Sequence, residues 1–142
     1  MSVLPDRPLS LHPERFLGTL SQDPVSSPLA GAQGYAAQEV GDGLAYHVPP
    51  GALAAARWLT ADFLLNGNHL AVFLLTLQEG EDGPVFRHTF GLLNQCQARL
   101  RLPLEAVNQN RWRYEREGAW LKPLCGGERV DLRRVDRLTL MV

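Results

Sequence analysis

Residues 57–78 read RWLTADFLLNGNHLAVFLLTLQ and carry the clearest fold signal in this chain of 142 residues. Asn66-Gly67 is a dipeptide favoured where a tight hairpin turn needs positive φ, and an extended apolar run lies on either side of it. The pattern predicts strands over residues 57–65 and 69–78 that pair antiparallel as one hairpin.

Alternation within the first run predicts how that strand is covered. One face carries Leu59, Ala61, Phe63 and Leu65, and the other carries Trp58, Thr60, Asp62 and Leu64. Successive side chains of a strand point to opposite faces, so both faces hold apolar groups. This favours a central strand covered on most of both sides, with Trp58 in the core.

The remaining chain reads as further short strands. Turn composition at residues 80–83 separates the second run from the next, and strands are predicted over residues 85–90, 96–104, 111–115, 119–123 and 135–142. In 96–104, Gln97, Arg99 and Arg101 alternate with apolar residues, which predicts one polar sheet surface, and Pro103 indicates a strand end. Short strands at this spacing are typical of a β-sandwich or barrel.

Composition and proline content predict the domain organisation. The chain is 45% apolar and 20% charged with a formal net charge of −1, which indicates one globular domain and no nucleic-acid partner. Five of the ten prolines lie in residues 1–33. That density predicts a proline-rich leader over 1–33 that wraps a β module over 34–142.

Two segment types that decide localisation are missing from the sequence. No apolar run approaches the roughly 20 residues needed to cross a bilayer, so no membrane partner is expected. Residues 1–11 lack the basic start and apolar centre of a secretion signal. The chain as written is therefore expected in the cytoplasm, unless it is cut from a larger secreted protein.

The residue inventory does not suggest an enzyme. Every serine lies at or before Ser27, in the proline-rich leader, so a Ser-His-acid triad is not expected. Glycoside hydrolysis needs two carboxylates across one cleft, whereas the acids here are spread over turns and strand ends. The histidines and the two cysteines have no metal-ligand spacing. No catalytic residue and no cofactor is predicted.

Three stretches resemble galactose-binding-like jelly-roll modules of the kind attached to bacterial glycoside hydrolases. They are WLTADFLL at 58–65, FGLLNQCQARLRLPL at 90–104 and GGERVDLRRVDRLTL at 126–140. The likeness covers roughly residues 34–142, and it implies a jelly-roll β-sandwich whose final strand is formed by the closing Val-Asp segment. It further implies a non-catalytic carbohydrate-binding or accessory module, with a polysaccharide or oligosaccharide as ligand and a catalytic domain as neighbour. Such modules often hold a structural calcium, for which Glu39, Asp42 and Asp136 are conceivable ligands, but the sequence has no Asp-x-Asp-x-Asp loop and no metal site is assigned.

Sugar binding requires a flat aromatic ring beside planar hydrogen-bonding groups. Trp112, Tyr114 and Trp120 lie close together in sequence, and Trp112 and Tyr114 share a strand face, which ordinary core packing also produces. The hypothesis places the ligand between this aromatic cluster and the polar row of Gln97, Arg99 and Arg101. His88 lies on a strand where it can point into the core or into a groove. A purely structural domain that packs on a catalytic neighbour is the alternative.

Overall fold

The computed structural model describes residues 9–20, 24–26, 33–108, 112–113, 120–121 and 125–142. Its strands are antiparallel and its longest helical element is a single 3-10 turn, η1 (Leu104–Ala106), so the predicted all-β class is confirmed. Within the described ranges no helix is long and apolar enough to cross a membrane.

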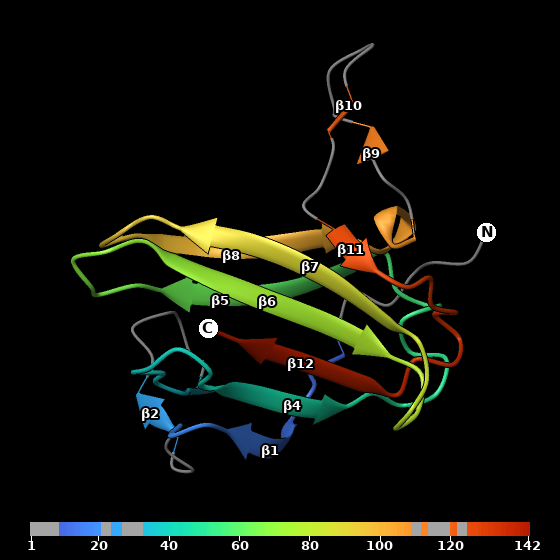
Figure 1. The fold of residues 1–142 in the computed structure, drawn as a ribbon, viewed down its shortest axis with the longest axis horizontal. Coiled ribbons are helices and arrows are strands. Elements are labelled where there is room, and N and C mark those ends of the chain that lie inside the picture. Colours follow the sequence, from blue (N-terminus) through green and yellow to red (C-terminus); the bar gives the residue numbers. More distant parts are fainter. Residues whose placement is uncertain (1–8, 21–23, 27–32, 109–111, 114–119, 122–124) are drawn as a thin grey trace.

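One six-stranded sheet forms the larger layer (Figure 1). Its spatial order is β1-β4-β12-β6-β7-β11. The strands are β1 (Pro13–Leu17), β4 (Gly43–His47), β6 (Ala71–Gln78), β7 (Val85–Leu92), β11 (Cys125–Gly127) and β12 (Arg137–Met141). The edge strand β1 lies within the proline-rich segment, and the final strand β12 is central, between β4 and β6.

A two-stranded ribbon packs on this sheet as a second layer, an arrangement consistent with a β-sandwich (Figure 1). It consists of β5 (Trp58–Leu64) and β8 (Gln97–Pro103), paired antiparallel along their whole length. Phe63 of β5 joins the layers, because its ring centroid lies 4.8 Å from that of Phe73 and 5.3 Å from that of Phe90. Two smaller pairs complete the strands: β2 (Val25–Ser26) with β3 (Gln33–Gly34), and β9 (Trp112–Arg113) with β10 (Trp120–Leu121).

The predicted hairpin between residues 57–65 and 69–78 is wrong. Both strands exist, but β5 pairs with β8, whereas β6 pairs with β7 and β12. Gly67 is not among the glycines with positive φ, so Asn66-Gly67 does not make the tight turn that such a hairpin needs. Residues 65–70 instead carry the chain between layers. Stacking the two strands face to face buries Phe63 against Phe73, which side-by-side pairing would not do.

The strands predicted over residues 85–90, 96–104 and 135–142 are confirmed as β7, β8 and β12, whereas those predicted over 111–115 and 119–123 lie partly outside the described residues. The turn over residues 80–83 joins β6 to β7, whose residues Gln78 and Val85 are cross-strand partners. Strand β8 ends at Pro103 as expected. The core between the layers is built from buried side chains of both, with Leu75, Leu77, Leu102, Val48 and Val135 each at most 2% exposed. Burial of this set provides the main stabilising free energy of the fold.

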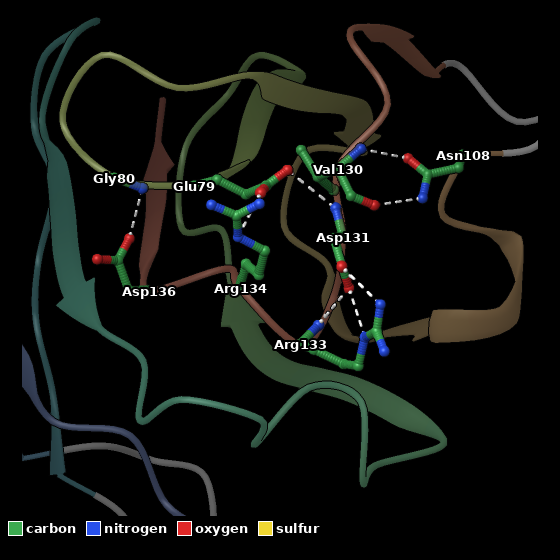
Figure 2. A network of polar contacts seen from close by, with 8 residues as sticks. All are labelled: Glu79, Gly80, Asn108, Val130, Asp131, Arg133, Arg134 and Asp136. Carbon is green, nitrogen blue, oxygen red and sulfur yellow. Dashed lines mark hydrogen bonds and ion pairs between the residues drawn. The ribbon is translucent and has the colours of Figure 1, made fainter.

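A polar network fixes the segment that leads into β12 (Figure 2). The backbone N–H of Asp131 donates to Glu79 Oε2 at 3.0 Å, and the N–H of Gly80 donates to Asp136 Oδ1 at 2.8 Å. Both contacts join residues 131–136 to the turn after β6. Hydrogen bonding to Arg133 also lowers the pKa of the Asp131 carboxyl. The closing segment is thereby held in one register against the larger sheet.

Candidate functional site

The outward side of the β5–β8 ribbon forms an open polar surface, which we call the ribbon face. It comprises Trp58, Thr60, Asp62 and Leu64 of β5 and Gln97, Arg99 and Arg101 of β8, all exposed. Strand register places Thr60 opposite Arg101 and Asp62 opposite Arg99. Because a strand rises about 3.4 Å per residue, the face is about 20 Å long.

Trp58 is the aromatic residue of this face. Its side chain is 44% exposed, so the predicted place in the core is wrong. The guanidinium carbon of Arg101 lies 4.3 Å from the centroid of the Trp58 ring. Such a cation–π contact is worth about 0.5–1 kcal/mol at an exposed site, enough to orient both groups. On the ribbon face the Arg101 guanidinium therefore lies over the ring of Trp58.

Asp62 and Arg99 form a two-point ion pair next to them. Arg99 Nε donates to Asp62 Oδ1 at 2.7 Å, and Nη2 donates to Oδ2 at 3.2 Å. The hydrogen bond from Arg99 lowers the pKa of Asp62, and the same contact raises the pKa of Arg99. Because both side chains are well exposed, the pair adds little to folding stability. Its effect is to hold planar donors and acceptors in a defined orientation on the surface.

A cleft of about 230 Å³ opens beside the ribbon, between the two layers. Phe63, Phe90 and Leu100 contribute to its apolar lining, and Arg99 and Arg101 also line it. The two arginines therefore border both the ribbon face and this cleft, which gives a ligand on the face an apolar recess next to charged donors.

His88 does not lie on the ribbon face. The side chain is 7% exposed on the inner side of β7, where its ring stacks on Phe90 at 5.7 Å between centroids. Its Nδ1 lies 3.6 Å from the Sγ of Cys125, whose thiol pKa is raised by burial. The structure thus separates His88 from Gln97, Arg99 and Arg101, with which the sequence hypothesis grouped it.

The predicted aromatic cluster is described only in part. Trp112 lies in β9 and pairs with Leu121 of β10, and Trp120 lies in β10 and pairs with Arg113. Their backbones are described, and their side chains, like all of Tyr114, lie outside the described residues. The choice between core and ligand platform for these three residues stays a prediction.

The conceivable calcium ligands are not brought together. Asp42 and Asp136 lie beyond opposite ends of the β4–β12 pairing, which runs from Gly43↔Met141 to His47↔Arg137. The Asp42 carboxylate is 1% exposed and already accepts hydrogen bonds from the backbone N–H groups of Gln38, Thr19 and Glu39 and from the Thr19 hydroxyl. These donors hold the pKa of Asp42 at about 2. The carboxylate links the segments that carry Thr19 and Gln38, and both of its oxygens accept hydrogen bonds.

Sequence reasoning missed Trp58 as a site residue, although the signal was present. The alternation correctly placed Trp58 on the same side as Thr60 and Asp62, opposite Leu59. It did not show which side another layer would cover. The polar row on the neighbouring run 96–104 was the available clue, because cross-strand partners share a face.

Comparison of the chain with protein-family models, with curated proteins and with solved structures finds no match. Evidence for function therefore comes from the arrangement of the chain's own side chains.

Proposed function

We propose that this protein is a non-catalytic carbohydrate-binding or accessory module of a carbohydrate-active enzyme, and that the ribbon face is its ligand platform. The observation that carries the proposal is the exposed Trp58 ring with the Arg101 guanidinium over it and the Arg99–Asp62 pair on the same face. A pyranose has an apolar face that stacks on such a ring and hydroxyls that pair with such groups.

The fold supports this assignment. β5 and β8 flank the β6–β7 hairpin in sequence and pair with each other above it, so one long ribbon is folded back over itself. That construction suits a jelly-roll sandwich, which agrees with the sequence resemblance to galactose-binding-like modules. In such a sandwich the alternate side chains of a strand pair follow one another in a row along one face, which suits an extended saccharide.

An apolar patch favours the alternative, a structural domain that packs on a catalytic neighbour. Leu70, Val72 and Leu93, at the end of the β6–β7 hairpin, are 60%, 53% and 67% exposed. Gly91 leaves space that the Leu70 side chain covers, since a Cβ at Gly91 would lie 3.3 Å from Leu70 Cδ1. Exposed apolar side chains gathered in this way are typical of contact surfaces.

Electrophoresis in gels that contain soluble polysaccharides tests the proposal. The gels would hold hydroxyethylcellulose, xylan, mixed-linkage glucan, galactomannan or agarose. We expect retardation by at least one of them and a 5- to 150-fold weaker affinity for Trp58→Ala, because ring stacking on an exposed aromatic is worth about 1–3 kcal/mol. Val72→Ala, on the other layer, is the matched control and should bind as the parent does. Retardation in none of the five gels, or equal losses in both variants, would refute the platform.

A further inference from the structure

Positive charge exceeds negative charge on the ribbon face. Arg99 and Arg101 of β8 lie there with a single carboxylate, that of Asp62 on β5. Arg99 already engages this carboxylate, because its Nε and Nη2 each donate to one of the two oxygens. Arg101 forms no ion pair with any residue that the structure describes. The ribbon face therefore keeps one cation without a partner of opposite charge.

The cleft beside the ribbon adds no negative charge. Among the described residues that line it, Arg99 and Arg101 carry charge and the others, such as Phe63 and Leu100, are apolar. Two guanidinium groups next to a surface with few polar atoms give this side of the molecule a positive local potential, although the chain as a whole has a formal net charge of −1. A ligand that crosses from the face toward the cleft thus meets cations.

The position of Arg101 relative to Trp58 bears on which sugars can stack. The guanidinium carbon lies 4.3 Å from the ring centroid, so one face of the ring is occupied. A sugar that stacks on that face must move the guanidinium and end the cation–π contact. A sugar carboxylate offers Arg101 a two-point, charge-assisted partner in exchange, whereas a hydroxyl offers a weaker, neutral one. Displacement of Arg101 is therefore more favourable for an acidic sugar than for a neutral one.

We propose that the ribbon face prefers acidic glycans, in which uronic acid residues carry carboxylates, to neutral ones. The Trp58 ring stacks on the sugar, and Arg101 pairs with its carboxylate. The inference rests on the proposed function for the site and for saccharide as the ligand, and it adds the charge of that ligand. Neutral glycans bind the same surface through Trp58, but more weakly, because they leave Arg101 without an anionic partner.

Isothermal titration of the whole chain with matched oligosaccharides tests the inference. The probes are the hexasaccharides of galacturonate, mannuronate and guluronate, each as the free acid and as the full methyl ester, which removes the charge and keeps the sugar ring. For at least one pair we expect the acid to bind about 5-fold more tightly than the ester, as for an exposed carboxylate–guanidinium pair. An increase in sodium chloride from about 0.1 M to about 1 M should remove this preference, because the screening length falls from about 10 Å to about 3 Å.

Four variants identify the groups responsible. Arg101→Gln should bind acid and ester equally, with the affinity that the parent has for the ester. Asp62→Asn releases Arg99 and should increase the preference for the acid. Trp58→Ala should weaken the binding of acid and ester alike. Arg87→Gln, at an exposed position on β7 in the other layer, is the matched control and should keep the preference of the parent.

The outcomes separate this inference from the proposed function. Equal affinities of acid and ester in the parent, or a preference that Arg101→Gln leaves intact, overturn the inference, while a loss of binding in Trp58→Ala still supports the saccharide platform. Equal effects of Arg87→Gln and Arg101→Gln overturn it as well, because overall charge would then explain both. Binding of none of the six probes overturns it, and retardation in the neutral polysaccharide gels then decides the proposed function alone. Thermal melting of each variant verifies that the fold is intact.

Discussion

Substitution of Asn108 is expected to lower the stability of the fold more than substitution of most other polar residues in the described structure. Its Oδ1 accepts the N–H of Val130 at 2.7 Å, and its Nδ2 donates to the carbonyl of Val130 at 2.5 Å (Figure 2). Val130 is 4% exposed, so water does not readily replace these bonds. The amide of Asn108 thereby imitates a strand partner and joins the segment after η1 to the segment before β12.

The cost of losing this side chain follows from the two backbone groups that it satisfies. An unpaired buried donor or acceptor costs about 1–3 kcal/mol, so Asn108→Gly should lower the free energy of unfolding by about 2–6 kcal/mol. Asn108 also has a φ of 73°, which glycine and asparagine tolerate and which costs other residues about 1–2 kcal/mol. Asn108→Ala should therefore be less stable than Asn108→Gly. Asn108→Asp keeps the acceptor for Val130 N–H but places a carboxylate oxygen against the Val130 carbonyl in place of the donor, so it should also be less stable than the parent.

Urea denaturation of the four proteins, followed by far-ultraviolet circular dichroism, measures these differences. The expected order of midpoints is parent, Asn108→Gly, Asn108→Ala, with Asn108→Asp also below the parent and with similar slopes. A loss below about 1 kcal/mol in Asn108→Gly would show that the two bonds to Val130 contribute little. A midpoint of Asn108→Asp equal to that of the parent would refute the role of the amide as a donor to the Val130 carbonyl.

Two further predictions concern Asp42 and Phe63, which connect separate parts of the fold. The pKa of Asp42 is lowered from 3.8 to about 2 by its hydrogen bonds, so its ionised form stabilises the fold fully above pH 4, and this contribution is lost as the pH falls toward 2. Urea midpoints measured between pH 2 and pH 6 should show the largest difference in stability between the parent and Asp42→Asn above pH 4. A difference that stays constant with pH would contradict this prediction. Phe63→Ala should lower the free energy of unfolding by about 2–4 kcal/mol, because the Phe63 ring packs on Phe73 and Phe90 but is only partly buried. Val72→Ala, at an exposed position, should change it by less than about 0.5 kcal/mol, and thermal melting of both variants measures the difference.

Local pattern predicted several strands, such as those over residues 85–90, 96–104 and 135–142, but it missed β1, β4 and β11. Alternation in residues 96–104 correctly exposed Gln97, Arg99 and Arg101, because side-chain direction in a strand is fixed by position alone. Turn composition at residues 80–83 correctly closed the β6–β7 hairpin, because that connection is local. These features depend on a few neighbouring residues, all of which are visible in one sequence.

The pairing of strands, and which strand faces a second layer covers, were not predictable in the same way. The pairing of β5 with β8 joins Trp58 to Pro103, residues far apart in the chain, and no short pattern specifies it. The dipeptide Asn66-Gly67 indicated a tight hairpin turn, but burial of Phe63 against the larger sheet favours a different pairing. Trp58 was misplaced for the same reason, since whether its face is covered depends on how many layers the fold has.

The same layering determines what the ribbon can do. A two-stranded ribbon is marginally stable alone, so the position of the ribbon face depends on the contacts beneath it, chiefly Phe63 and Leu102 against the six-stranded sheet. Because no described residues form a third layer over the ribbon, Trp58 and the Asp62–Arg99 pair face outward on a support that packing has made rigid. The inner side of each strand therefore contributes stability and the outer side is free to vary. An aromatic ring and an ion pair on that outer side add little to folding, so their substitution tests the binding that we propose with little effect on the fold.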